Sequence, residues 1–246
     1  MKEILQSAVL GIVQGLTEFL PVSSSGHLVL VESLFNFKSP GAFYETILHL
    51  GTLVAVVFYF RDYIKTIRFS EIKLLIVATI PAAIIGVLFK DPIESLFNST
   101  KLVGVALLFT ALINYLMEKQ SGKKEKPDLF DSVVVGFAQA VAIIPGISRS
   151  GSTILAGRSM KLDPEVAARF SFLMSIPIIL GANLVQIASH GFEITSEIPV
   201  YLVGLLTSFL AGVFSIGFLM AMIKEKKMRV FSVYLVIVGL IAILLI

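Results

Sequence analysis

Two polar segments interrupt apolar sequence in this chain, and their residue types suit chemistry on a phosphate group. The segments are residues 14–27 and 139–152. The first contains the carboxylate of Glu18, three serines and His27, and the second contains serines and Arg149. Titratable groups are costly to bury in apolar surroundings, so such residues inside membrane-like sequence indicate function. We therefore treat the two segments as parts of one candidate site.

The two segments are copies of one pattern at a constant offset of 125 positions. The identical positions are Ser7/Ser132, Val9/Val134, Gly11/Gly136, Gln14/Gln139, Ser23/Ser148, Ser25/Ser150, Gly26/Gly151 and Leu30/Leu155. An ungapped repeat of this kind indicates two related halves. Only the first copy carries Glu18 and His27, and only the second carries Arg149, so each copy supplies groups that the other lacks.

Serine and glycine cluster in both copies at the point where a helix is expected to restart. A helix N-terminus presents unpaired N–H groups and a partial positive charge, which favour an anion such as phosphate. The planar fork of Arg149 can bind two phosphate oxygens at once. The predicted phosphate-binding residues are Ser23, Ser25, Gly26, Ser148, Ser150, Gly151 and Ser152.

Glu18, Ser24, His27 and Arg149 form a set suited to phosphoryl transfer, with a nucleophile, a proton carrier and a charge stabiliser. Ser24 is one candidate nucleophile, with His27 handling its proton, and His27 itself is the other. Glu18 is also a candidate ligand for Mg²⁺ or Ca²⁺ bridging the phosphates. The alternative, non-catalytic interpretations are that the small and serine residues only pack helices closely, that Glu18 only caps a helix or pairs with Arg149, and that His27 only makes structural hydrogen bonds. For His49 we expect packing.

Composition indicates a polytopic membrane protein. Hydrophobic residues make up 56% of the 246 residues and charged residues 15%, and the mean hydropathy is +0.91. A soluble domain carries about 25% charged residues. The absence of cysteine excludes disulfides, thiolate zinc sites and a cysteine nucleophile. The net charge of +3 resides in loops on one side, which favours a membrane topology over nucleic-acid binding.

The predicted fold is all-α, with six transmembrane helices and two re-entrant helix-loop-helix hairpins. The predicted spans are 43–60, 71–89, 101–118, 165–189, 197–223 and 229–246. The predicted hairpins are 1–37 and 129–160, each broken by Pro, Gly and serines. Residues 1–20 contain Gln6, Gln14 and Glu18, so we expect no cleaved signal peptide there.

Three spans separate the hairpins, and an odd number makes the two copies face opposite ways. This predicts a single membrane domain, 1–246, built as an inverted-topology repeat of 1–118 and 129–246. Lysine and arginine are denser in the loops at 61–73, 119–126, 158–161 and 224–229, which places those loops and the 119–128 linker in the cytoplasm.

At these residues the chain closely resembles the undecaprenyl-diphosphate phosphatase family, also called the bacitracin-resistance proteins. The matching stretches are Gly15–His27, Pro145–Thr153, Ala167–Leu173 and Ile176–Pro177. The resemblance implies a plasma-membrane hydrolase that converts undecaprenyl diphosphate to undecaprenyl phosphate, recycling the lipid carrier for cell-wall (peptidoglycan) synthesis. It also implies that Glu18, Ser24, His27 and Arg149 are functional positions and that the site opens to the outer face.

One position departs from the family pattern, and the main alternative function is transport. The family often has glutamate where this chain has Gln14, so this chain offers one carboxylate, Glu18, where the family offers two, and a bound cation would rely on Glu18 and the substrate phosphates. Inverted repeats with broken helices also build transporters, so a lipid-phosphate flippase is the competing hypothesis. Expected partners are the polyprenyl diphosphate substrate and membrane lipids, with a homodimer left open and no nucleic acid.

Overall fold

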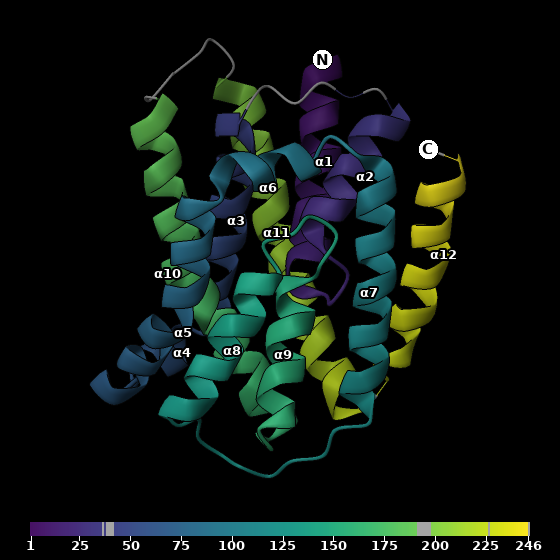
Figure 1. Ribbon diagram of the computed structural model, residues 1–246. Coiled ribbons are helices and arrows are strands. Elements are labelled where there is room, and N and C mark those ends of the chain that lie inside the picture. Colours follow the sequence, from purple (N-terminus) through teal and green to yellow (C-terminus); the bar gives the residue numbers. More distant parts are fainter. Residues whose placement is uncertain (36, 38–41, 191–197, 226, 246) are drawn as a thin grey trace.

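The chain folds as a bundle of helices in a computed structural model (Figure 1). The structure describes residues 1–35, 37, 42–190, 198–225 and 227–245, with the side chains at 42–43 and 186–190 outside that description. Within these ranges there are helices but no strand. The helices are α1 (Lys2–Phe19), α2 (Ser24–Phe35), α3 (Ala42–Tyr59), α4 (Arg61–Ile64), α5 (Phe69–Leu88), α6 (Lys90–Leu96), α7 (Thr100–Glu118), α8 (Leu129–Val141), α9 (Arg149–Ser159), α10 (Pro164–His190), α11 (Ile198–Lys224) and α12 (Arg229–Leu245).

The predicted all-α polytopic membrane fold is confirmed. Among the described residues, four helices are long and apolar enough to cross a membrane: α5, α7, α11 and the Pro164–Val185 part of α10. The expected spans 43–60 and 229–246 correspond to α3 and α12, whose apolar parts among the described residues are Tyr44–Tyr59 and Arg229–Leu245. Positions 197 and 246, at the ends of two predicted spans, lie outside the described residues. The short helices α4 and α6 were not predicted.

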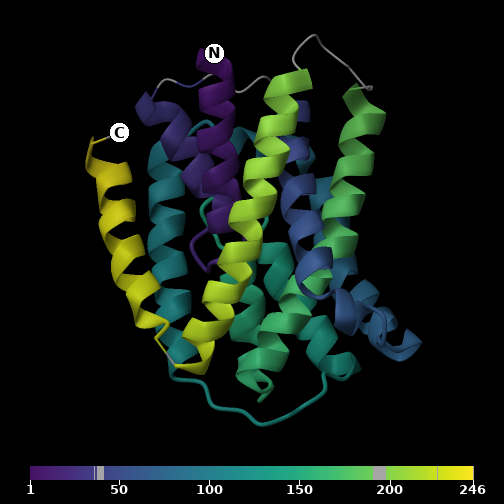
Figure 2. The ribbon, with the colours of Figure 1, turned by 180° about the vertical axis from the view of Figure 1, so that it is seen from behind.

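Two helical hairpins enter the bundle from opposite ends (Figures 1 and 2). α1 and α2 enter from the end where the chain begins, which we call the terminal end. α8 and α9 enter from the linker end, where residues 119–128 run. We define the first tip as residues 20–24 and the second tip as residues 142–149. The tips touch, because Ser150 at the start of α9 donates a hydrogen bond from its hydroxyl to the Leu20 carbonyl at 3.0 Å.

A proline ends α1, the first helix of the first hairpin. A residue that precedes proline is pushed out of the helical region by the proline ring. Leu20, which precedes Pro21, accordingly has an extended backbone with φ −62° and ψ 144°. In the second tip Gly146 corresponds to Pro21, and the chain turns there with a φ of +93°, which favours glycine.

Helix α7 supports both tips at equivalent positions. Asn114 Nδ2 donates to the Pro21 carbonyl at 2.6 Å, and Thr110 Oγ1 donates to the Gly146 carbonyl at 2.8 Å. Pro21 and Gly146 are 125 positions apart, like the matched residues of the repeat. These paired contacts support an approximate two-fold relation between the halves. The division into 1–118, 119–128 and 129–246 stays a prediction.

The first helix of each hairpin, α1 or α8, packs closely on a neighbouring helix through matched glycines. A Cβ on Gly11 of α1 would lie 2.7 Å from the Gly204 carbonyl of α11, and one on Gly136 of α8 would lie 2.8 Å from the Ala78 carbonyl of α5. Real Cβ atoms do not approach so closely, and small residues of this kind let membrane helices meet backbone to backbone. The close fit fixes the depth of each hairpin.

The linker is tied to the base of the second hairpin. Lys124 Nζ donates to Asp128 at 2.7 Å and to Asp131 at 2.5 Å, and these bonds raise the pKa of Lys124 above its usual value. Asp128 and Asp131 also form a reciprocal capping box at the start of α8. The Arg158 guanidinium donates to the Gln120 carbonyl. The second hairpin is therefore anchored at its open end.

Candidate active site

Glu18 and Arg149 join the two tips. Arg149 Nη2 lies 2.5 Å from Glu18 Oε1, an ion pair between the last turn of α1 and the first residue of α9. Ser24 Oγ donates to the other carboxylate oxygen, Oε2, at 2.6 Å, and Gln14 Nε2 donates to the same oxygen at 3.0 Å. Ser24 and Arg149 are equivalent positions of the repeat, so the carboxylate bridges the same point of both halves.

The ion pair is largely withdrawn from solvent and has the partners that burial demands. The side chain of Glu18 is 8% exposed and that of Arg149 is 15% exposed. A buried charge pair is tolerated only when further hydrogen bonds satisfy it. Arg149 Nη1 also donates to the Ser171 carbonyl of α10 at 3.2 Å, and the Ser171 hydroxyl pairs with Thr153 at 2.6 Å. The guanidinium is thereby held in a fixed direction.

The remaining serines of the first tip stabilise its turn. Ser23 has a φ of 70°, which is unusual for a residue other than glycine. Its hydroxyl accepts a hydrogen bond from the Gly26 amide at 3.3 Å and pairs with the Ser25 hydroxyl at 3.3 Å. These groups are therefore engaged with one another, and their role as phosphate ligands stays a prediction.

The second tip repeats this arrangement. The Ser148 hydroxyl accepts from the Gly151 amide at 3.1 Å and pairs with the Ser150 hydroxyl at 3.1 Å. Ser148 is the N-cap of α9, which satisfies one of the free amides there. The hydroxyl of Ser152 is buried and has no hydrogen-bond partner among the described residues. Phosphate binding by these residues also stays a prediction.

A cavity of about 170 Å³ opens beside the ion pair. It is lined by Glu18, His49, Ala82, Gln139, Ala142, Ile143, Arg149, Ile178, Ile179, Ala182 and Asn183. Within the described part of the chain, Gln139 Oε1 and Asn183 Nδ2 are buried without a hydrogen-bond partner. Buried polar atoms are normally paired, so two unpaired amide atoms in one cavity indicate room for a polar ligand. We call this space the polar cavity.

His49 faces the polar cavity, a position that sequence reasoning missed. Its Nδ1 lies 2.7 Å from Gln14 Nε2 and 3.8 Å from Glu18 Oε2, and its side chain is 34% exposed. Because the Gln14 amide is the donor, Nδ1 accepts and the ring proton sits on Nε2. The expectation that His49 serves packing took no account of Glu18, which lies far away in sequence. Asn183 was missed for the same reason.

His27 lies apart from the Glu18 cluster. Its Nδ1 is 2.8 Å from the Ser23 carbonyl, and its Nε2 is 2.8 Å from the Tyr234 hydroxyl of α12. The two rings stack with centroids 5.6 Å apart. His27 is not among the residues that line the polar cavity. The structure therefore brings together Glu18, Ser24 and Arg149, while both nitrogens of His27 have other partners.

The donor set does not fit a cation held by the protein alone. Among the described residues no group of three or more His, Asp or Glu side chains could hold a metal ion. Both oxygens of Glu18 already accept from other side chains, and Gln14 directs its amide nitrogen toward Glu18. Mg²⁺ and Ca²⁺ require several oxygen ligands. Gln14 and Glu18 do not supply them.

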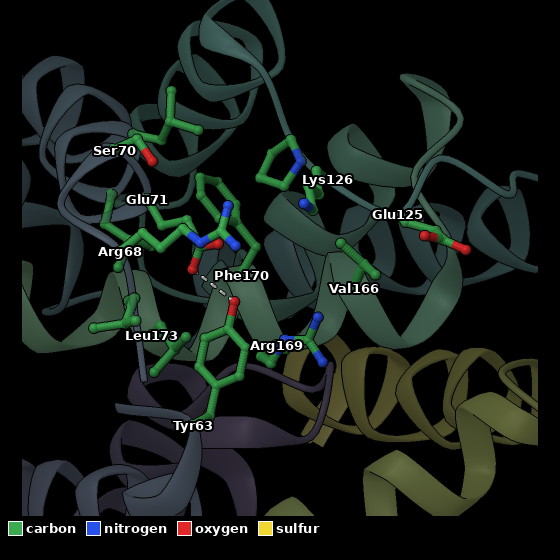
Figure 3. Close-up of a pocket in the computed structure, with 14 residues that line it drawn as sticks. Tyr63, Arg68, Ser70, Glu71, Glu125, Lys126, Val166, Arg169, Phe170 and Leu173 are labelled. Carbon is green, nitrogen blue, oxygen red and sulfur yellow. Dashed lines mark hydrogen bonds between the residues drawn. The ribbon is translucent and has the colours of Figure 1, made fainter. Parts of the chain in front are cut away.

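A second cavity, of about 220 Å³, lies at the linker end between α4, α5, α10 and the linker (Figure 3). Tyr63 donates a hydrogen bond to Glu71 at 2.9 Å, and the Arg169 guanidinium lies 4.6 Å from the Tyr63 ring centroid. Burial and the bond to Glu71 raise the pKa of Tyr63 above its usual value. None of the predicted site residues lines this cavity. We therefore assign the candidate active site to the polar cavity.

Comparison with known proteins places the chain in one family. The family model described as "Bacitracin resistance protein BacA" matches residues 7–241. Proteins named undecaprenyl-diphosphatase are 42% identical to the chain in Methanosphaera stadtmanae, over 100% of this chain and 99% of the relative, and in Halothermothrix orenii, over 99% and 98%. A third, from Carboxydothermus hydrogenoformans, is 42% identical over 95% and 94%. This chain therefore belongs to the BacA family of bacitracin resistance proteins.

Proposed function

We propose that this protein is a membrane hydrolase that converts undecaprenyl diphosphate and water to undecaprenyl phosphate and inorganic phosphate. The observation that carries the proposal is the carboxylate of Glu18, which contacts the Ser24 hydroxyl at 2.6 Å and the Arg149 guanidinium at 2.5 Å. A hydroxyl, a proton acceptor and a fixed cation at one point are the groups that phosphoryl transfer needs. The names of the relatives agree with this activity.

The geometry supports Ser24 as the nucleophile. Its oxygen attacks the terminal phosphorus while its proton passes to Glu18 Oε2, which already accepts that hydrogen bond. The bond from phosphorus to the bridging oxygen breaks, and undecaprenyl phosphate leaves. Water then hydrolyses the phosphoserine, which releases inorganic phosphate and restores the hydroxyl. Arg149 binds the oxygens of the terminal phosphate and stabilises their charge in the transition state.

The two histidines have different places in this scheme. His49 lies beside Glu18 and lines the polar cavity, so its ring N–H is suited to hold and direct the attacking water. His27 holds the turn that carries Ser24, through its bond to the Ser23 carbonyl. The alternative of a phosphohistidine at His27 stays a prediction, and it requires His27 to leave Tyr234.

The proposed orientation follows the basic residues. The linker end carries Lys124, Arg158, Lys224 and Arg229, and we place it in the cytoplasm by the positive-inside rule. The site then opens toward the outer face of the plasma membrane. The opposed hairpins also support the proposal that residues 1–118 and 129–246 are inverted repeats. A homodimer stays a prediction.

Transport of a lipid phosphate is the second candidate function. Two hairpins enter from opposite ends and meet at a charged pair. This arrangement favours transport, because transporters place their binding sites where such repeats meet. A carrier, however, has no chemical use for a serine hydroxyl hydrogen-bonded to a carboxylate. Hydrolysis therefore explains more of the site.

Phosphate release by purified protein in detergent tests the proposal. Undecaprenyl diphosphate should give inorganic phosphate without a sealed membrane, and Ser24→Ala should lower the rate by at least about 100-fold. Ser70→Ala, an exposed serine at the linker-end cavity, is the matched control and should keep the normal rate. Normal release by Ser24→Ala would remove Ser24 as nucleophile. Lipid flux in vesicles without phosphate release by wild-type protein would favour the transporter.

A further inference from the structure

Asn183 of α10 is a buried polar residue in the wall of the polar cavity. It is 6% exposed, whereas its chain neighbours Ala182 and Leu184 are exposed, so its side of α10 is turned inward. It lines the polar cavity, and its Nδ2 has no hydrogen-bond partner among the described residues. A buried amide without a partner lowers stability, because it has given up its hydrogen bonds to water. Asn183 therefore calls for a ligand that supplies the partner.

Asn114 of α7 shows what a structural asparagine does in this bundle. It is fully buried, and its Nδ2 donates to the Pro21 carbonyl at 2.6 Å, which ties α7 to the first tip. Polar side chains commonly join membrane helices through hydrogen bonds of this kind. The Nδ2 of Asn183 makes no such bond to any described residue. Helix association therefore does not account for Asn183.

Gln139 of α8 brings the other unpaired amide atom to the polar cavity, and that atom is of the opposite kind. Its Nε2 donates to the Ala78 carbonyl at 3.2 Å, and its Oε1 is the atom without a partner among the described residues. A carbonyl oxygen only accepts hydrogen bonds, so it suits a water molecule and repels an anionic oxygen, whereas an amide nitrogen only donates. Of these two residues, Asn183 is therefore the one suited to an anion.

Asn183 lies nearer to the terminal end than the place where Arg149 meets α10. Arg149 Nη1 donates to the Ser171 carbonyl at 3.2 Å. Asn183 follows Ser171 by twelve residues, about 18 Å of helix rise, and α10 runs toward the terminal end (Figure 1). The side chain leans back toward the start of its helix, which shortens the gap, but one phosphate does not span it. A ligand that contacts both residues must therefore carry anionic oxygens at two positions along the cavity.

We propose that Asn183 binds the second phosphate of the diphosphate substrate, the one that stays on the lipid, a proposal that rests on the hydrolase function above. The terminal phosphate lies at Ser24 and Arg149. When Ser24 attacks, the bond from the terminal phosphorus to the bridging oxygen breaks, and its electron pair goes to the phosphate that leaves. The N–H groups of Asn183 donate to the oxygens of that phosphate and stabilise the charge it gains. Asn183 thereby favours a diphosphate over a monophosphate as substrate.

The first test sets activity against stability. Asn183→Leu removes the unpaired amide, so the melting temperature should rise by about 2 °C or more, while kcat/KM for undecaprenyl diphosphate should fall about tenfold or more. Asn183→Gln keeps a donor and should retain at least about three times the kcat/KM of Asn183→Leu. Asn114→Leu should lower both quantities, and Asn98→Leu, at an exposed asparagine outside the polar cavity, should change neither. A lower melting temperature or normal turnover in Asn183→Leu would overturn the proposal.

A binding measurement separates the contact from the chemistry. Methylenediphosphonate, a diphosphate analogue that cannot be hydrolysed, should protect wild-type protein and Asn98→Leu from thermal unfolding. Its apparent affinity for Asn183→Leu should be at least about tenfold weaker, whereas the affinity for inorganic phosphate should change less than about twofold. Equal protection of Asn183→Leu and wild-type protein, or no protection of wild-type protein beyond that by phosphate, would overturn the second phosphate site. A wild-type protein that releases no phosphate would instead overturn the hydrolase, and the binding comparison would still decide the role of Asn183.

Discussion

The two tips have nearly the same hydrogen-bonded frame but different chemical groups. Ser23 and Ser148 each accept from a glycine amide three residues later, and each pairs with the serine two residues later. α7 donates a hydrogen bond to each turn. The tips differ at two positions of the repeat. Glu18 of the first copy corresponds to Ile143 of the second, and Ser24 corresponds to Arg149.

This difference separates the residues that build the turns from those that supply chemistry. The matched residues position the backbone of both tips, and the unmatched residues Glu18, Ser24 and Arg149 meet at one carboxylate. The repeat therefore places two frames face to face, and the departures from the repeat make the site. The turns also differ in backbone, since the positive φ falls on Ser23 in one tip and on Gly146 in the other.

Removal of Arg149 should have the largest effect, because it takes away the contribution of the second tip to the site. Arg149→Ala should lower phosphate release by about 1,000-fold through loss of charge stabilisation. It should also destabilise the protein by roughly 3–5 kcal/mol, because Glu18 is left buried without its partner. Phosphate assays and thermal unfolding measure the two effects. Arg68→Ala, an exposed arginine, is the control, and equal rates in the two variants would exclude Arg149 from the site.

Because the backbones of the tips differ, substitution of Gly146 should destabilise the protein much more than substitution of Ser23. A Cβ on Gly146 would lie 2.6 Å from both the Val103 carbonyl and the Ala106 side chain, at a φ of +93°. Gly146→Ala should therefore destabilise the protein by about 2 kcal/mol or more. Ser23→Gly relieves a strained φ but loses a cap, so its stability should change by less than about 1 kcal/mol. Similar thermal shifts for both variants would contradict this account of the turns.

A second carboxylate at position 14 should have the smallest effect, and it would test whether the acidic group of the first tip can recruit a cation. Gln14→Glu places a carboxylate beside Glu18, since the Gln14 amide now lies 3.0 Å from it. Two carboxylates attract a divalent cation. A chelator should therefore lower phosphate release by the variant at least about threefold more than release by wild-type protein. Equal sensitivity to the chelator would show that this position does not control cation use.

Much of the candidate site was predictable, because the repeat can be recognised from the sequence alone. The constant offset indicated two equivalent hairpins, and Pro21 and Gly146 marked where each one turns. The repeat indicated that Glu18 and Arg149 would lie at one site, and their direct pairing was the alternative interpretation. The long spans followed from hydropathy alone, and α5, α7, α10 and α11 confirm them.

The rest depended on packing that no local pattern encodes. His49 and Asn183 reach the polar cavity because α3 and α10 pack against the hairpins at one particular rotation. His27 lies one turn after Ser24, so its spacing indicated the site, yet its ring turns toward Tyr234 of α12. The expected spans 43–60 and 229–246 agree with α3 and α12 to within one residue over the described part of the chain, because both are bounded by a change in hydropathy.

The support of both tips by α7 has a consequence for the protein in membranes of different thickness. Thr110 and Asn114 are one helical turn apart on a single rigid rod, and each holds one loop. A tilt of that rod displaces both loops together, so the spacing between the reacting groups is insulated from the lipid composition around them. Bilayer thickness should therefore change the activity less than it changes the depth at which the hairpins lie in the membrane.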